Sequence, residues 1–236
     1  MQEGVLDLDA DINTALRSWR VPANDGWQPR VTLRHLLSHA AGLTYCWYPG
    51  YRRGMPTPTL LQTLRGEPPA TTLPVRVTAI PGTQSRYSGS HFSALQQLLE
   101  DVTGEPFPKL MRALVFAPLD MRHTSYDQAF PDTHSGATAA GHDRGGWPID
   151  GQWRVLPEMA GAGLWTTAGD LARLAIAIQQ AFTGRPSAVL NQASAQRMLG
   201  LQIADRGLGW QVHPSATDVR FEHGGDNIGY QCRLVA

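Results

Sequence analysis

Lysine is almost absent from this chain of 236 residues, although basic residues as a class are not. Of the 20 basic residues, one is Lys109 and the other 19 are arginine. A lysine one helical turn after a serine can accept the proton of the serine hydroxyl, but Pro106 stands three residues before Lys109. Arginine stays protonated, so it cannot replace lysine as a base. The sequence therefore contains no Ser-x-x-Lys pair, which excludes a serine nucleophile activated in that way among these residues.

Cysteine and long apolar runs are also scarce. Cys46 and Cys232 lie far apart and form no Cys-x-x-Cys pair, so we expect two buried thiols and neither a zinc site nor a disulfide framework. No apolar run reaches 18 residues, which excludes a membrane-spanning helix. Residues 1–7 have neither a basic nor an apolar stretch, so they predict no signal peptide and favour the cytoplasm.

Net charge is absent as well. The chain has 20 acidic and 20 basic residues and a pI of about 7.1, so nothing in its charge indicates nucleic acid or an anionic membrane surface as a partner. Its 42% hydrophobic and 17% charged residues are ordinary for a globular protein. We expect one domain over 1–236, with a mostly helical lobe over about 30–200 and sheet strands over about 205–236.

Helix signals recur through the first 200 residues. Thr32, Asn191 and either Thr166 or Thr167 are expected N-caps, and Gly66 and Gly104 expected stops. The segment after Pro106 should bury Leu110, Leu114 and Val115. The expected helices cover about 4–20, 32–39, 57–66, 92–102, 106–115, 167–184 and 191–199.

Other segments predict strands or loops. Residues 44–54 and 120–160 have no periodicity, so we expect a loop over a cleft and a long surface excursion. Alternating apolar residues near 208–212, 219–221 and 230–234 predict three antiparallel strands.

Five short motifs, in this order, resemble those of the serine β-lactamase-like family, which includes class C β-lactamases, penicillin-binding D-peptidases and related esterases. They are Leu36-Leu37-Ser38-His39-Ala40-Ala41-Gly42-Leu43, Tyr87-Ser88-Gly89, Glu100-Asp101-Val102-Thr103-Gly104, Gly163-Leu164-Trp165-Thr166-Thr167 and His223-Gly224-Gly225.

The resemblance implies an α+β fold of the β-lactamase/transpeptidase type, with a helical lobe packed on a partial antiparallel sheet and the site between them. In the family, a serine and its lysine lie on a helix that would precede residue 4, and further strands follow the His-Gly-Gly strand. We therefore expect a family member truncated at both ends, with no cofactor and no metal. Substrates of intact relatives would be small-molecule esters, peptides or lactams.

Tyr87, Ser88 and Gly89 correspond to the family's Tyr-x-Asn loop. The resemblance assigns the phenol of Tyr87 a catalytic role in moving a proton toward the leaving group, and assigns Ser88 and Gly89 to substrate binding. Glycine at position 89 replaces the usual asparagine, so the amide that could donate to a substrate is absent. Restoring asparagine there is expected to tighten substrate binding. A tyrosine that only packs against the start of a helix is the alternative.

His223, Gly224 and Gly225 correspond to the family's substrate-binding strand, whose backbone pairs with an extended substrate and contributes to the oxyanion hole. A glycine corner in a hairpin is the alternative. His35 and His39 have the spacing of a zincin helix, but Leu36 stands where its glutamate would be, so we interpret them as a helix end in which His39 bonds the following loop.

Three functions stay open on the sequence. The first is a serine hydrolase fragment that is inactive alone, from a family that cleaves amides or esters through an acyl-serine. The second is a non-catalytic module that binds peptide-like or lactam ligands. The third is half of a site that another chain completes with the missing serine helix.

The chain should form no covalent adduct with a serine-directed fluorophosphonate or with a penicillin, because no serine is followed by lysine at helical spacing. Intact-mass spectrometry after incubation with each reagent measures this. Stoichiometric addition at any serine would show that the chain holds a nucleophile that the sequence does not reveal.

Overall fold

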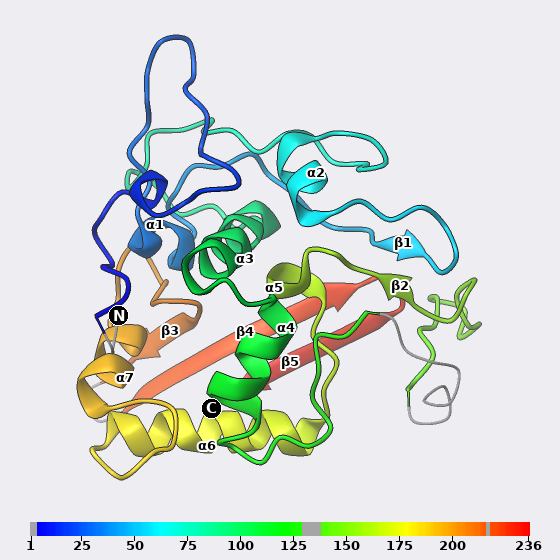
Figure 1. The fold of residues 1–236 in the computed structure, drawn as a ribbon. Coiled ribbons are helices and arrows are strands. Elements are labelled where there is room, and N and C mark those ends of the chain that lie inside the picture. The colour runs from blue at the N-terminus through cyan, green and yellow to red at the C-terminus, as the bar shows by residue number, and fades with distance from the viewer. Residues whose placement is uncertain (1–3, 129–137, 216–217) are drawn as a thin grey trace.

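The computed structural model describes residues 4–128, 138–215 and 218–236. Short helices dominate the first two thirds of the chain, and strands the last part (Figure 1). In chain order the elements are η1 (Ile12–Thr14), α1 (Leu33–Leu37), β1 (Tyr51–Arg52), α2 (Leu60–Arg65), α3 (Gly89–Thr103), α4 (Phe107–Met111), η2 (Arg112–Phe116), β2 (Arg154–Val155), α5 (Met159–Ala162), α6 (Ala168–Phe182), α7 (Gln192–Leu199), β3 (Gln211–Pro214), β4 (Val219–Asn227) and β5 (Tyr230–Val235).

Capping residues set most helix ends as the sequence predicts. The side chains of Thr32, Thr167 and Asn191 accept backbone N–H bonds at the starts of α1, α6 and α7. Gly66 and Gly104 end α2 and α3 in the left-handed conformation, which costs glycine no Cβ clash. One boundary shifts, because Thr59 rather than Thr57 caps α2.

Two helix predictions are wrong in part. The helix expected over 4–20 is a single 3-10 turn, in which the Asp11 side chain accepts from the Asn13 N–H, a local bond that competes with helix propagation. The helix after Pro106 changes from α to π at Arg112. That change rotates the buried face, so Phe116 is buried and Leu114 is 55% exposed.

Helix α3 is the centre of the helical lobe. It contacts α1, α2, α4 and α5, and Ala94 and Leu98 from its inner face are buried in a core that also takes apolar residues from the N-terminal segment and from α1. The side chain of Asp101 ties the N-terminal segment to this helix, since it accepts from the N–H groups of Arg17 and Ser18.

The last strands form one antiparallel sheet in the order β3-β4-β5, which confirms the predicted arrangement. A second core packs this sheet against α6 and α7, through Ile178, Leu199, Val212 and Phe221; α6 runs below the sheet in Figure 1. The fold is thus α+β, with helices and a small antiparallel sheet.

The segment 120–160 is not only a surface excursion. Its part 129–137 lies outside the described residues, but Trp153, Leu156 and Glu158 are buried, and β2 pairs with β1 in a small sheet that the sequence did not predict. The thiol expectation is also half wrong, because Cys46 is buried and Cys232 is exposed.

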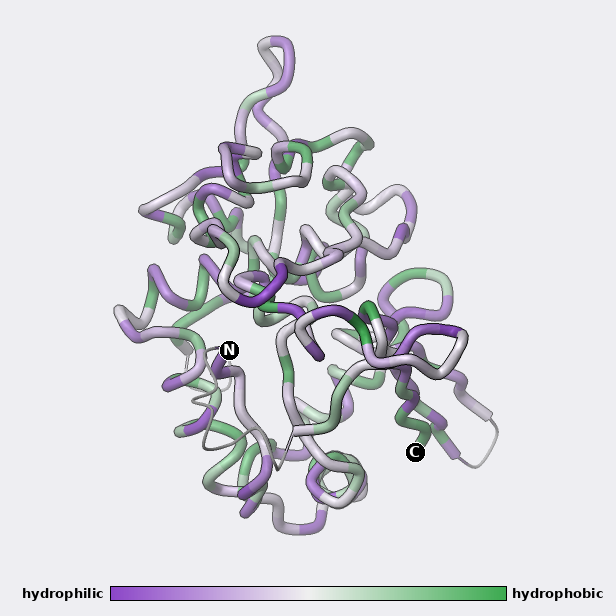
Figure 2. Tube along the Cα trace, turned by 90° about the vertical axis from the view of Figure 1, so that its right-hand side faces the viewer, coloured by the Kyte–Doolittle hydropathy of each residue, from purple (hydrophilic) through white to green (hydrophobic). Residues whose placement is uncertain are grey.

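Apolar and polar stretches alternate along most of the trace (Figure 2). Among the described residues, no helix is both long and apolar enough to cross a membrane.

Glu158 is a carboxyl group with incomplete pairing inside the helical lobe. It is 0% exposed. Its Oε1 accepts from the Thr63 hydroxyl at 2.9 Å, and its Oε2 is buried without a hydrogen-bond partner among the described residues. Burial raises the pKa of Glu158, because a low-dielectric environment disfavours the charged form.

Wild type should lose stability as pH rises because Glu158 becomes charged in a buried position, and Glu158→Gln should abolish this loss. The folded chain holds a proton on Glu158 that the unfolded chain has released, so this group's stabilisation is complete below its usual pKa of 4.5 and is lost as pH rises through the folded pKa. Across that window the variant should gain about 1–3 kcal/mol relative to wild type, measured by urea unfolding at several pH values. Glu105→Gln, in an exposed pair with Lys109, should change stability by less than about 0.5 kcal/mol. Equal pH profiles for wild type and Glu158→Gln would contradict the assignment.

Candidate functional site

Tyr87 and His223 face each other from distant parts of the chain. Tyr87 precedes α3 and is 45% exposed, whereas His223 lies on β4. Their ring centroids are 6.2 Å apart, so the fold brings together the tyrosine and the strand that the sequence singled out. We name the surface between these two rings the Tyr87 opening.

The loop that carries Tyr87 is held by the end of α1. The Arg86 N–H donates to the His39 carbonyl at 2.9 Å, and the Ser85 hydroxyl donates to the Ser38 carbonyl at 3.0 Å. The ring of His39 lies 4.5 Å from the Tyr87 ring. His39 thus bonds the loop at 85–88, and not the loop directly after it.

Ser88 has a capping role in this structure. It is fully buried as the N-cap of α3, and its oxygen accepts from the Cys46 N–H and donates to the Thr44 carbonyl, each at 2.9 Å. Its hydroxyl is thereby directed into the protein. A role of Ser88 in substrate binding stays a prediction. Because its hydroxyl bonds the protein backbone, Ser88 could affect a substrate only by positioning Tyr87.

Gly89 fills a space that admits no side chain. A Cβ at this position would lie 2.5 Å from the Tyr48 ring and 3.2 Å from the Cys46 carbonyl. Tyr48 is itself buried, with its hydroxyl 2.7 Å from that of Ser93. The ring of Tyr48 therefore occupies the direction in which an asparagine at position 89 would project.

The two glycines of β4 differ in what their backbones face. Phe221 exchanges both backbone hydrogen bonds with Ala236 beside β5, so by alternation His223 and Gly225 also face β5, and Gly224 faces the opposite edge. Strand β3 pairs with β4 only as far as Glu222. Among the described residues no strand covers that edge at Gly224, which leaves its N–H on an open strand edge.

Gly225 lies close to a side chain of the neighbouring strand. A Cβ there would approach the Cys232 sulfur to 2.6 Å, whereas a Cβ at Gly224 would meet its nearest neighbour, the Cys232 carbonyl, at 3.9 Å. Gly224 therefore accepts a Cβ without change, whereas a Cβ at Gly225 requires the exposed Cys232 side chain to move.

Electrostatics keep the groups of the Tyr87 opening neutral near pH 7. Burial raises the pKa of the Tyr87 phenol, and the positive charge of Arg206 offsets part of this increase. Burial also lowers the pKa of His223, partly offset by a hydrogen bond to the Gly224 backbone. Tyr87 therefore carries its proton, as a general acid requires, and His223 is an uncharged imidazole.

Exposed aromatic side chains border the Tyr87 opening. Tyr45 is 58% exposed and Trp47 is 47% exposed. The Trp47 indole N–H donates to the Asp226 carbonyl at 3.3 Å, and the Asn227 amide donates to the Ala162 carbonyl at 2.8 Å. These two bonds join the helical lobe to the β4–β5 hairpin.

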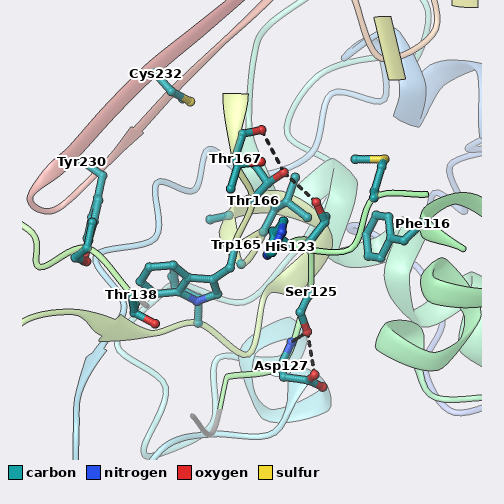
Figure 3. Close-up of a pocket in the computed structure, with 18 of the residues that line it drawn as sticks. Phe116, His123, Ser125, Asp127, Thr138, Trp165, Thr166, Thr167, Tyr230 and Cys232 are labelled. Atoms are coloured by element: carbon teal, nitrogen blue, oxygen red, sulfur yellow. Dashed lines mark hydrogen bonds between the residues drawn. The ribbon is translucent and has the colours of Figure 1, made fainter. Parts of the chain in front are cut away.

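A cavity of about 1080 Å³ is lined by Gly225 and Asn227 of β4 and by Arg112 and Phe116 of η2. Figure 3 shows Trp165, Tyr230 and Phe116 around it, with Cys232 further along β5, the strand that carries Tyr230. The Trp165 and Tyr230 rings meet edge to face at 5.7 Å. Ser125 donates to Asp127 at 2.6 Å, so this serine bonds a carboxylate directly and not a histidine base. Among the described residues, no group of three His, Cys, Asp or Glu side chains could hold a metal ion.

Comparison with known proteins fits this geometry. A family model described as Beta-lactamase matches residues 1–236. The chain belongs to the beta-lactamase family. This membership accounts for the five motifs together, including those such as 100–104 that lie away from the Tyr87 opening.

Relatives within the beta-lactamase family have several activities in their names. The chain is 32% identical over 141 residues to a beta-lactamase of Pseudomonas fluorescens, covering 57% of this chain and 37% of that protein. It is 28% identical over 244 aligned residues to esterase EstB of Burkholderia gladioli, covering 88% and 59%. The chain thus spans less than two thirds of the length of these relatives.

A solved structure shows the same fold. The octameric penicillin-binding protein homologue from Pyrococcus abyssi superposes with a TM-score of 0.75 at 20% identity, covering 100% of this chain and 54% of that one. This likeness confirms the β-lactamase/transpeptidase type of α+β fold expected from the motifs.

Several residues of the Tyr87 opening were not predicted from the sequence. His91 and Arg206 have no motif of their own, and only the fold brings them near Tyr87 and His39. His39 was noticed for a zincin spacing, but it lies beyond the end of α1 at a φ of 56°, so it does not share a helix face with His35.

Gly89→Asn should destabilise the fold by about 1–3 kcal/mol, because the new side chain collides with the buried Tyr48 ring. This outcome replaces the expectation that asparagine would improve the site. Gly224→Ala is the matched control, and it should cost less than about 1 kcal/mol, since its Cβ is unobstructed. Urea unfolding compares the two, and an unchanged midpoint for Gly89→Asn would mean that Tyr48 moves aside freely.

Proposed function

We propose that residues 1–236 supply the tyrosine and the substrate-binding strand of a serine hydrolase site, and that these 236 residues alone do not hydrolyse ester or amide bonds. The observation that carries the proposal is the facing pair of Tyr87 and His223 beside an open strand edge, in a sequence without Ser-x-x-Lys. We therefore assign the serine and lysine to a segment outside these 236 residues, on the same polypeptide or on another.

The reaction requires each group in a defined role. The external serine oxygen attacks the carbonyl carbon while its lysine takes the hydroxyl proton, and the bond to the leaving group breaks when that group accepts a proton. Tyr87 carries a proton at neutral pH and lies at the Tyr87 opening, which supports its role in this transfer. Water then cleaves the acyl-serine and returns the serine hydroxyl.

Gly224 offers a backbone donor to the substrate. Its N–H lies on the edge of β4 that β3 leaves uncovered, where an extended acyl group can add as a short strand. In this role His223 and Gly225 support the edge from the β5 side, the former through its contact with Tyr87 and the latter through its fit against Cys232.

The substrate class follows from this edge and from the relatives. An extended strand edge suits a peptide or a lactam side chain, and relatives are named as an esterase and as a D-alanyl-D-alanine carboxypeptidase. We propose small esters, D-peptides or lactams as the substrates of the completed site. The exposed rings of Tyr45 and Trp47 favour an apolar or aromatic acyl group.

A binding function without chemistry is the second candidate. The open edge at Gly224 is formed entirely by the residues present, so it can hold a ligand without the nucleophile. Reversible binding of a D-Ala-D-Ala peptide or of a penicillin to the 236-residue chain, measured by calorimetry with no change in intact mass, would favour this function.

Addition of a segment with Ser-x-x-Lys, with the strands that flank it in longer relatives, should create hydrolysis that depends on Tyr87. Tyr87→Phe should then reduce kcat by roughly 100- to 10,000-fold, the usual contribution of a general acid or base, because the phenol has a proton to move only once serine and leaving group are present. Release of nitrophenol from a chromogenic ester measures the rate.

Tyr45→Phe serves as the control, because it removes an exposed phenol from the rim of the same opening and should leave kcat near that of the repaired protein. If Tyr87→Phe hydrolyses the ester as fast as the repaired protein, the role assigned to Tyr87 is wrong. If the repaired protein is inactive although it folds and binds penicillin, the binding function replaces the hydrolase.

A further inference from the structure

Two buried histidines lie directly beneath Tyr87. His39 is 3% exposed and follows α1, and His91 is 1% exposed in the first turn of α3. Their rings meet edge to face with centroids 5.2 Å apart, and the His39 ring lies 4.5 Å from that of Tyr87. His39 has a φ of 56°, a left-handed conformation that is uncommon for residues other than glycine. Its ring is therefore placed under the tyrosine by an unusual backbone turn.

The hydrogen bonds of the pair assign both tautomers. The Ser88 N–H can only donate, so Nδ1 of His39, 3.4 Å away, must accept. The Ser88 carbonyl can only accept, so Nδ1 of His91, 3.0 Å away, must donate. The two Nδ1 atoms are 3.4 Å apart, and this contact fits the same assignment, with the His91 N–H directed at the unprotonated nitrogen of His39. His39 then carries its proton on Nε2, and His91 on Nδ1.

The two histidines bind both backbone polar groups of Ser88. His39 takes the N–H of Ser88 and His91 takes its carbonyl, and Ser88 follows Tyr87 directly in the chain. The peptide group before the Ser88 Cα is thus held by His39 and the one after it by His91, while the face of the His39 ring limits where the phenol ring can lie.

From this geometry we propose that His39 and His91 are positioning residues, which hold Tyr87 against His223 as a pair of neutral imidazoles with opposite tautomers. The pair works only while both rings are uncharged. A proton added to Nδ1 of His39 would point at the Ser88 N–H and the His91 N–H. Three hydrogen-bond donors would then meet with no acceptor between them. A proton added to Nε2 of His91 would occupy an atom that is buried and has no partner among the described residues.

The surrounding charges also oppose protonation. Arg86, on the Tyr87 loop, acts on His91, while Arg206 and His223, on the sheet side, act on His39. In the described part of the chain, the charged groups that act on the two histidines are arginines, which are positively charged, or a histidine, which becomes positive when it is protonated. Burial is the larger cause, and it lowers the pKa of His39 to about 2 and that of His91 to about 4.

Nitrogen-15 NMR of the histidine side chains tests the proposal on the 236-residue chain itself, without any substrate or nucleophile. At pH 7 the His39 signal should show its proton on Nε2 and the His91 signal its proton on Nδ1, and neither should titrate between pH 8 and pH 5. The Tyr87 ring signals should stay constant over the same range. The tautomers do not depend on catalysis, so this test is separate from that of the proposed function.

Matched variants separate the imidazoles from the backbone. Asparagine adopts left-handed backbone readily, so His39→Asn keeps the turn and offers an amide oxygen to the Ser88 N–H, whereas His39→Gly keeps only the turn. His91→Asn keeps a donor for the Ser88 carbonyl, and His91→Leu removes it. The asparagine variants should retain the Tyr87 signals more closely than His39→Gly and His91→Leu, in which those signals should shift and broaden. His123→Asn, on an exposed segment, should leave them unchanged.

Acid unfolding supplies a second readout. A histidine whose folded pKa lies below its unfolded pKa of 6.5 stabilises the fold fully above 6.5, and this contribution is lost as pH falls. At pH 5 unfolding should take up about one proton fewer in His91→Asn than in wild type. The proposal is overturned if the two rings show the reverse tautomers, if both titrate near pH 6.5, or if His39→Gly leaves the Tyr87 signals in place.

Discussion

The junction between Tyr87 and the first turn of α3 depends on Ser88. Its oxygen bonds the backbone of the 44–46 segment, and its peptide groups bond the two buried histidines. These contacts join three segments that are far apart in sequence, the end of α1, the aromatic loop after it and the start of α3. Because Tyr87 precedes Ser88 directly, its position on the surface is determined by bonds made inside the protein.

Two hydrophobic cores lie on the sides from which Tyr87 and His223 come, and Met198 packs against both of them. One core lies within the helical lobe around α3, and the other joins the sheet to α6 and α7. Trp47 and Asn227 cross from one side of the opening to the other, each through a single hydrogen bond to a backbone carbonyl.

Sequence patterns identified the elements better than they identified the contacts. Thr32, Thr167 and Asn191 act through bonds to their own helix, so their local signals were sufficient. The role of Ser88 and the space at Gly89 depend on Cys46, Thr44 and Tyr48, which are some 40 residues away in sequence. A spacing rule along one helix could not reveal them. The π-turn at Arg112 escaped prediction for a related reason, since it changes the periodicity on which the rule rests.

The edge of β4 shows why binding capacity can persist where side chains are missing. Neither lysine nor the usual asparagine is present at the expected places, but the donor at Gly224 belongs to the backbone and depends only on how far β3 extends. Gly225 leaves room for the Cys232 side chain on β5, and the ring of His223 lies near that of Tyr87. A strand edge of this kind binds an extended backbone and does not distinguish the side chains attached to it. In the proposed function, discrimination among substrates is therefore assigned to the exposed rings of Tyr45 and Trp47, which add apolar surface without being part of the strand.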